Sequence, residues 1–176
     1  FDFKKSDIFL FLGECHLKIS KVDKADSFFQ KSLELNSSKI NLLNVYKIYD
    51  ECNFREKASK LLKESSFFKN DDEITLKYCN DQIIHNLLNY QETYTILSKF
   101  VQDKVISSQI YNLLGMCSLF LGKIEEAKKN FLASVDLDYT DANLSSSSTY
   151  ISSSYYQLAQ MNYKFDENSL EKIKNL

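Results

Sequence analysis

The side chains of this chain that could do chemistry are its four cysteines and two histidines. Thiolates and imidazoles bind zinc or act as nucleophile and base when several of them stand close together. The cysteines, however, are widely spaced and form no C-x-x-C pair: Cys15, Cys52, Cys79 and Cys117. This spacing does not fit a tetrahedral zinc site, so we expect neither a metal nor a cofactor.

The one adjacent pair, Cys15 and His16, does not fit a catalytic dyad. Neighbouring residues on a helix point in different directions, so a thiol and an imidazole at successive positions do not face each other. We expect Cys15 and Cys117 to pack in the core as small apolar residues. We expect His16 to pack between helices, whereas His85 could contact a ligand.

A short acidic cluster, Asp71-Asp72-Glu73, is the remaining candidate for chemistry. It precedes a predicted helix, where carboxylates cap free N–H groups and favour the helix dipole; a metal site is the alternative. The chain has no Walker loop, G-x-G-x-x-G, H-E-x-x-H or G-x-S-x-G motif, and only 3 glycines with which to build a phosphate-binding loop. We therefore predict that it is not an enzyme.

The elements that must position these residues are predicted to be helices. The 176 residues are 44% hydrophobic and 26% charged, with no proline to interrupt long helical stretches. Lysines and acidic residues are interspersed and the net charge is −2, so there is no basic stripe, which argues against direct nucleic-acid binding. No apolar run reaches the roughly 18 residues of a membrane span. Scattered cysteines favour free thiols and a cytoplasmic location.

The chain also repeats itself. Residues at matching places are 102 positions apart, as in Gly13 and Gly115, Ala25 and Ala127, and Phe29 and Phe131. This separation is three times the roughly 34-residue period of helix-turn-helix repeats. We therefore expect two further repeats between the two clear ones.

The two clear copies resemble the tetratricopeptide repeat family, whose pattern is W-x2-L-G-x2-Y, then A-x3-F, then P. The first copy has Phe9-x2-Leu12-Gly13-x2-His16 and Ala25-x3-Phe29, and the later copy has Tyr111-x2-Leu114-Gly115-x2-Ser118 and Ala127-x3-Phe131. Ser37 and Tyr139 replace the proline. The resemblance covers residues 6 to 141 well and residues 149 to 176 weakly.

Physical reasons for these residue types can be given from helix packing. Gly13 and Gly115 remove a side chain where a second helix must come close, and Phe29 and Phe131 fill the wedge between helices. Ser20 and Gly122 fall in the turn between the two helices. The acidic Asp23, Glu125 and Glu126 fall at the start of each second helix, where the dipole favours negative charge.

The other repeats are weaker. In the second we assign Leu42, Val45, Tyr46 and Tyr49 to the first helix, and Ala58 and Leu62 to the second. In the third we assign Tyr78, Ile83, Ile84 and Leu87 to the first helix, and Tyr90, Thr93, Leu97 and Phe100 to the second. After Asp141, the run Ser145–Ser148 is a loop or a helix start. Tyr155–Tyr163 is then a first helix and Asn168–Leu176 its partner.

The resemblance implies an all-α, right-handed α-solenoid of about four stacked helix-turn-helix repeats plus a partial fifth. The repeats are expected at about 6–38, 39–73, 74–107 and 108–141, with a degenerate one at 149–176, in a single domain covering 1–176. The aromatic residues near the end of the sequence are either core residues or an exposed aromatic patch: Tyr150, Tyr155, Tyr156, Tyr163 and Phe165.

The implied function is a protein–protein interaction scaffold, part of a larger complex subunit, that binds a peptide or helix in a concave groove. By analogy with the family, the groove residues are Lys47, Tyr78, Gln82, His85, Asn86, Asn112, Met116 and Phe120. Leu10 and Glu14 replace the Lys and Asn of the carboxylate clamp that chaperone-binding members share, which disfavours that ligand. The alternative function is a peptide-sensing regulatory domain coupled to an effector module outside these residues.

Overall fold

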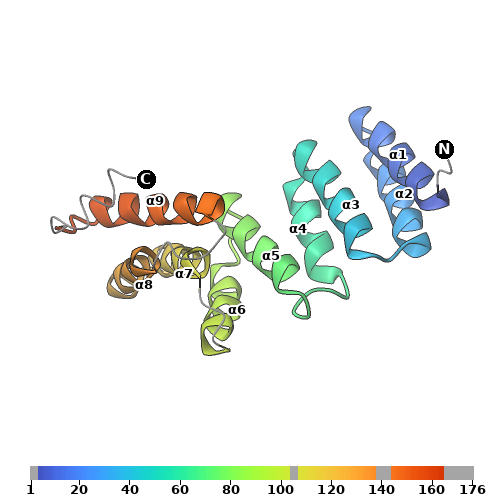
Figure 1. Ribbon diagram of the computed structural model, residues 1–176. Coiled ribbons are helices and arrows are strands. Elements are labelled where there is room, and N and C mark those ends of the chain that lie inside the picture. Colours follow the sequence, from blue (N-terminus) through green and yellow to red (C-terminus); the bar gives the residue numbers. More distant parts are fainter. Residues whose placement is uncertain (1–3, 104–106, 138–143, 165–176) are drawn as a thin grey trace. The chain divides into compact units, whose positions relative to one another are not determined.

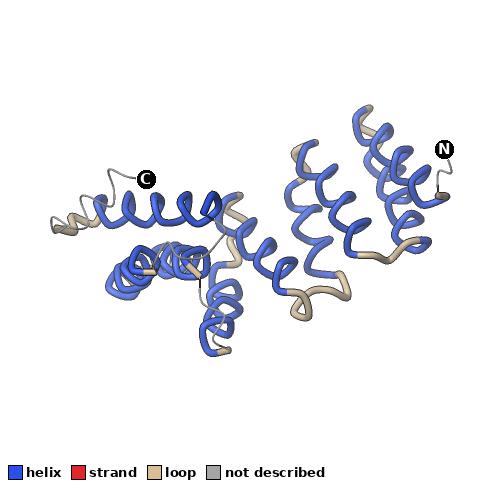
Figure 2. Tube along the Cα trace, viewed as in Figure 1, coloured by secondary structure: helices blue, strands red, loops and turns tan. Residues whose placement is uncertain are grey.

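The computed structural model describes residues 4–103, 107–137 and 144–164, which are helices joined by turns and contain no strand (Figure 1; Figure 2). The helices in these ranges are α1 (Lys5–Lys18), α2 (Val22–Leu35), α3 (Lys39–Glu51), α4 (Arg55–Glu64), α5 (Asp72–Ile84), α6 (Tyr90–Gln102), α7 (Ser108–Phe120), α8 (Ile124–Asp136) and α9 (Leu144–Gln160). The predicted fold class, all-α with helix-turn-helix repeats, is confirmed.

The helices group into two compact units, Phe1–Asp81 and Gln82–Leu176, which we call the N-terminal and C-terminal units. In the N-terminal unit α1 packs against α2, and α3 packs against α4. In the C-terminal unit α7 packs against α8, while α9 contacts both of them and α6 contacts α7. A single continuous domain and a right-handed winding stay predictions.

The two clear repeats are built on a contact between glycine and phenylalanine. A Cβ atom placed on Gly13 would lie 2.5 Å from Cδ1 of Phe29, and one placed on Gly115 would lie 2.5 Å from Cε1 of Phe131. Both phenylalanine side chains are buried. The ring of the second helix therefore rests on the glycine of the first helix, as the sequence predicts. Phe29 also meets Tyr49 of the next helix pair edge to face, at 4.9 Å between ring centroids.

The turns between paired helices use left-handed backbone conformations. The φ angles are 59° at Ser20, 64° at Asn53 and 73° at Gly122. Glycine adopts this conformation without steric cost, and asparagine tolerates it better than most residues. The predicted turn positions are thus confirmed, and acidic residues occupy the first turns of α2 and α8 as expected.

A buried serine closes each clear helix pair, and the sequence pattern alone did not single it out. Ser32 Oγ donates to the carbonyl oxygen of Ser6 at 2.8 Å, and Ser134 Oγ donates to that of Ser108 at 2.9 Å. The two donor serines are 102 positions apart in the sequence, and so are the two acceptor serines. Each bond ties the end of a second helix to the start of its first helix, so it satisfies two polar groups inside the core.

The second repeat follows the prediction and the third departs from it. The six residues assigned to the second repeat are all buried: Leu42, Val45, Tyr46, Tyr49, Ala58 and Leu62. In the third repeat, α6 buries Thr93 and Leu97 as expected. However, α5 ends at Ile84, whose side chain is 63% exposed, so Leu87 lies beyond the helix and its predicted place there is wrong.

Helix α9 decides between the two alternatives for the serine run. Residues 145–148 lie inside α9, so the helix-start alternative is the correct one. Its buried Ile151, Tyr155 and Leu158 join Phe131 in one apolar cluster, which makes Tyr155 a core residue, whereas Tyr156 is 62% exposed. Tyr150 and Tyr163 are half-buried. Phe165 and the predicted helix at Asn168–Leu176 lie outside the described residues.

A buried carboxyl joins α5 to α3. Asp81 is only 4% exposed, and its Oδ1 accepts a hydrogen bond from the Tyr46 hydroxyl at 3.0 Å. Burial raises the pKa of Asp81 from 3.8 to about 6, against the opposing effects of the Tyr46 hydrogen bond and the Lys77 charge. The ammonium of Lys77 also lies 4.3 Å from the centroid of the Tyr46 ring.

Replacing Asp81 with asparagine should therefore make stability less dependent on pH. The unfolded chain ionises Asp81 near pH 4 but the folded chain only near pH 6, so stability is lost as pH rises through this window. Two pKa units correspond to about 3 kcal/mol. In urea unfolding, we expect Asp81→Asn to gain about 1–2 kcal/mol relative to wild type between pH 5 and pH 7.5. An equal difference at both pH values would contradict this assignment.

Candidate protein-binding surface

The cysteines and histidines lie in different environments. Cys117 is buried as predicted, and its burial raises the thiol pKa to about 12. Cys15 is exposed, so its predicted place in the core is wrong. Helix α7, which carries Cys117, packs against α6, α8 and α9, whereas α1, which carries Cys15, packs mainly against α2. His16 stacks on Phe28 with ring centroids 5.2 Å apart, as the packing prediction requires.

The acidic cluster before α5 caps the helix. Asp71 Oδ1 accepts from the backbone N–H of Ile74 at 3.1 Å, and Asp71 Oδ2 lies 2.7 Å from the Lys39 ammonium. The Lys39 hydrogen bond lowers the pKa of Asp71. Glu73 also contacts Lys39 at 2.6 Å. The capping prediction is confirmed, and the described residues contain no group of three or more potential metal ligands.

Three of the eight predicted groove residues are buried. Tyr78 is 1% exposed and meets Phe68 edge to face at 5.0 Å between centroids. Asn112 is 3% exposed, and its Nδ2 donates to Ser154 Oγ at 2.8 Å, joining α7 to α9. Gln82 is 2% exposed. Such side chains support the helices and leave almost no surface for a ligand, so we do not carry them into the proposed site.

The other five predicted groove residues are at least partly accessible. Lys47, in the N-terminal unit, is exposed and lies 3.6 Å from Glu51 one turn later. In the C-terminal unit, His85 and Met116 are half-buried, and Asn86 is exposed. Phe120 is 47% exposed. A groove that runs through all the repeats stays a prediction, because these residues are divided between the two units.

In the C-terminal unit the structure brings Asn86, Tyr90, Met116 and Phe120 into one patch, which we call the Phe120 surface. The rings of Tyr90 on α6 and Phe120 on α7 stack with centroids 4.4 Å apart and planes 14° from parallel. The Tyr90 hydroxyl donates to Asn86 Oδ1. Met116 precedes Phe120 by one turn of α7 and packs against the apolar cluster of α8 and α9. The patch is therefore an ordered aromatic pair with an amide at its edge.

A strained turn before α6 holds this patch in place. Asn86 and Leu88 have φ angles of 54° and 66°, which nonglycine residues seldom adopt. The buried Gln82 fixes the turn, since its carbonyl oxygen accepts from the N–H of Leu87 at 3.0 Å and its Oε1 accepts from Asn89 Nδ2 at 2.9 Å. Gln82 thus acts on the surface indirectly, by positioning Asn86 and Tyr90.

Comparison with known families decides what kind of repeat this is. Residues 6–39 and 108–141 match the family model described as tetratricopeptide repeat. The chain carries tetratricopeptide repeats. Searches of curated proteins and of solved structures found no match. Tetratricopeptide repeats are protein-interaction modules, so the coarse function that the resemblance implies is protein binding.

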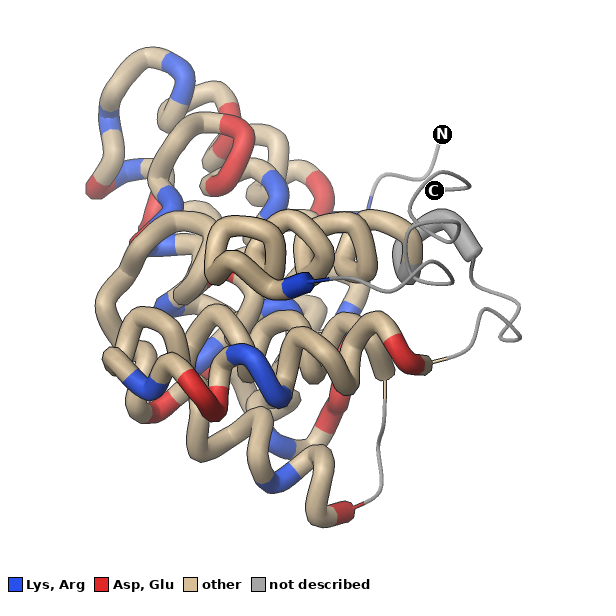
Figure 3. The backbone as a smooth tube through the Cα atoms, turned by 90° about the vertical axis from the view of Figure 1, so that its left-hand side faces the viewer, with Lys and Arg blue, Asp and Glu red and all other residues tan. Residues whose placement is uncertain are grey.

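The surface of these tetratricopeptide repeats carries mixed charge. Basic and acidic positions are interspersed along the helices (Figure 3), and several pair one turn apart, as Lys18 with Glu14 at 2.5 Å. Helix α9 contains no charged residue. None of the described helices is long and apolar enough to cross a membrane.

The sequence missed two features that bear on binding. Tyr90 was assigned only to the second helix of the third repeat, and its stacking on Phe120 places it on the Phe120 surface. A pocket beside α2 was not predicted at all, because its carboxylates Asp26 and Glu34 look like ordinary solvated positions of an amphipathic helix. No sequence signal separates such residues from the rest of an exposed helix face.

Proposed function

We propose that this chain is an interaction scaffold that binds a helix or extended segment of a partner protein on the Phe120 surface. One observation carries the proposal: the Tyr90–Phe120 stack remains accessible, with Phe120 47% exposed, although it is ordered by neighbours from two helices. Single exposed apolar side chains are common, but adjacent apolar side chains that form an exposed patch often mark an interaction site.

The chemistry of the Phe120 surface suits a peptide ligand. Aromatic residues are enriched among the few side chains that dominate binding energy, because they bury much area with few rotatable bonds. Stacking fixes the side chains of Phe120 and Tyr90 in the free protein, so less side-chain conformational entropy is lost on binding. The Asn86 amide can then donate to a backbone carbonyl of the ligand, since its Nδ2 group is a donor.

The wider role that follows is membership of a multiprotein assembly in the cytoplasm. Repeat proteins present extended binding surfaces, which suits a role in holding partner proteins together. The mixed surface charge supports a protein partner over nucleic acid, which would require a continuous basic surface. This role rests on the Phe120 surface, and it fails if that surface binds nothing.

Replacing Phe120 with alanine should therefore weaken partner capture at least tenfold, the effect of losing a side chain worth about 1.4 kcal/mol or more in an interface. The measurement is affinity capture from native lysate with quantitative mass spectrometry, after circular dichroism has shown unchanged helix content. Phe11→Ala is the matched control, because Phe11 is 64% exposed on α1 of the other unit.

Partners that bind wild type and Phe11→Ala equally but are lost with Phe120→Ala would support the proposal. A photo-crosslinking residue at position 120 should then attach to the same partners. If both variants capture every partner as wild type does, binding runs through another part of the chain and the Phe120 surface is not the site.

A further inference from the structure

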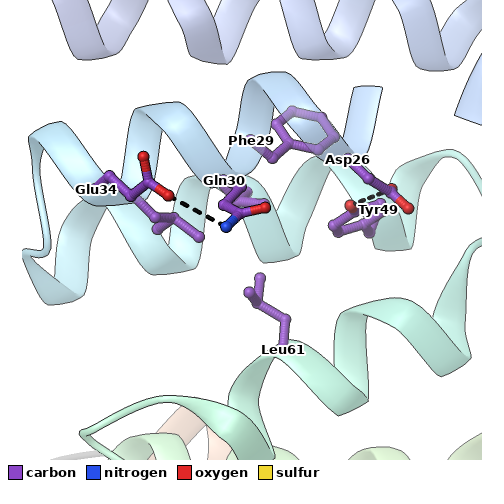
Figure 4. Close-up of a pocket in the computed structure, with 8 residues that line it drawn as sticks. Asp26, Phe29, Gln30, Glu34, Tyr49 and Leu61 are labelled. Atoms are coloured by element: carbon purple, nitrogen blue, oxygen red, sulfur yellow. Dashed lines mark hydrogen bonds between the residues drawn. The ribbon is translucent and has the colours of Figure 1, made fainter. Parts of the chain in front are cut away.

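The N-terminal unit contains a pocket of about 410 Å³ between α2, α3 and α4 (Figure 4). This volume is within the range of about 300–1,000 Å³ typical of ligand pockets. The residues that line it are Asp26, Phe29, Gln30, Leu33, Glu34, Val45, Tyr49 and Leu61. Six of these eight residues lie on the second helices α2 and α4. The predicted groove residues Lys47, Asn112, Met116 and Phe120 lie instead on first helices.

The floor and walls of the pocket are apolar. Phe29, Val45 and Tyr49 are buried and form its base. Leu33 of α2 and Leu61 of α4 line the pocket and are half-buried. Leu61 points from α4 toward α2 (Figure 4). An aliphatic or aromatic side chain that entered would lose its contact with water and cover Leu33 and Leu61.

The rim along α2 is acidic, but its two carboxylates differ. Asp26 Oδ1 accepts from the Tyr49 hydroxyl at 2.6 Å, and Asp26 Oδ2 lies 2.5 Å from the Lys57 ammonium, so Asp26 is already neutralised. Glu34 is exposed and accepts from Gln30 Nε2 at 3.1 Å. Among the described residues no lysine or arginine pairs with Glu34, which leaves one carboxylate available to a ligand.

We propose that this pocket binds a peptide segment of a partner protein that presents one apolar side chain and, three or four residues away, a lysine or arginine. The apolar side chain enters between Val45 and Leu61, and the cation pairs with Glu34. Gln30, which Leu61 faces across the pocket (Figure 4), is four residues before Glu34 on α2, or about 6 Å along the helix. Side chains three or four positions apart on a bound helix lie on one face with a similar separation, so one can enter the apolar space while the other reaches Glu34.

The test uses synthetic eight-residue peptides with an acetylated N-terminus. Each carries Leu or Phe at one position and Arg, Gln or Glu four positions later. Methyl groups of Val45, Leu33 and Leu61 are labelled, and their NMR shifts are followed as peptide is added to the full chain. We expect these methyls to shift, with arginine peptides binding about fivefold more tightly than glutamate peptides, as one exposed ion pair allows.

Glu34→Lys should reverse the order, so that glutamate peptides bind better than arginine peptides. The control is Glu51→Lys, which changes the same charge at an exposed position of α3 outside the pocket. It should leave the preference for arginine unchanged. Raised salt should shrink the preference in wild type, because exposed charges are screened.

Three results would overturn the proposal. The labelled methyls could fail to shift with any peptide, or the charge preference could survive Glu34→Lys. Alternatively, the same methyls could shift with protein concentration before peptide is added, which would assign the pocket to a second copy of the chain. None of these results bears on the Phe120 surface, so that proposal is tested separately.

Discussion

Phe131→Ala will lower the free energy of unfolding by about 3–5 kcal/mol, the range for removing a phenylalanine from a packed core. The Phe131 side chain is 0% exposed and belongs to the cluster that joins α8 to α9. Its ring also rests on Gly115 of α7. The substitution therefore opens a cavity where three helices meet, and the surrounding backbone can close only part of it.

Urea unfolding followed by circular dichroism measures this loss. Phe11→Ala is the matched control, because Phe11 is 64% exposed and its loss should change the unfolding free energy by no more than about 0.5 kcal/mol. Phe29→Ala should behave like Phe131→Ala, since Phe29 is 2% exposed and rests on Gly13. If Phe131→Ala cost no more than Phe11→Ala, the ring would not be the centre of this contact.

Gly115→Ala will also destabilise the protein, by about 1–3 kcal/mol, the usual cost of overpacking a core. The sign of this stability change is informative, because in the interior of a helix alanine is normally more stabilising than glycine by about 1 kcal/mol. In this position the new Cβ would lie 2.5 Å from Cε1 of Phe131, and the buried ring is enclosed by α9 residues such as Ile151. Steric overlap should therefore exceed the gain in helix propensity.

A double-mutant cycle separates these two effects. In the Phe131→Ala background the overlapping ring is gone, so Gly115→Ala should stabilise the chain by up to about 1 kcal/mol. Unfolding free energies of the four proteins measure this change of sign. Gly122→Ala is a useful contrast, because a Cβ there meets nothing within 4 Å and any loss comes from its φ of 73°. The same effect of Gly115→Ala in both backgrounds would contradict the steric explanation.

The sequence predicted the helix pairs well because each depends on local and periodic signals. Gly13 with Phe29 and Gly115 with Phe131 are spaced so that the partner helix must return over the glycine. Where those signals weaken, the sequence predicted less: its placement of Leu87 in α5 is wrong, and it allowed either a loop or a helix start for the serine run at 145–148, which the structure decides in favour of a helix. Serines favour loops by propensity, but packing of α9 against α7 and α8 outweighs that preference.

The candidate site was predicted less well, for a physical reason. The spacing of apolar residues along the sequence shows which face of a helix is apolar. Whether a particular polar residue is covered depends on the neighbouring helix that packs across it. Asn112 looks like a groove amide in sequence, yet α9 brings Ser154 within 2.8 Å of it. Cys15 and Cys117 occupy matching places, and only Cys117 is covered.

The sequence by itself thus determined the helix pairs and the family of their repeats, because the contacts that close each pair recur at fixed spacing. Only the tertiary structure decided which side chains reach solvent. Tyr90 and Phe120 are 30 residues apart in sequence, and their stacking depends on how α6 lies on α7. The pocket beside Glu34 likewise exists because α2, α3 and α4 leave space between them, which no periodicity encodes.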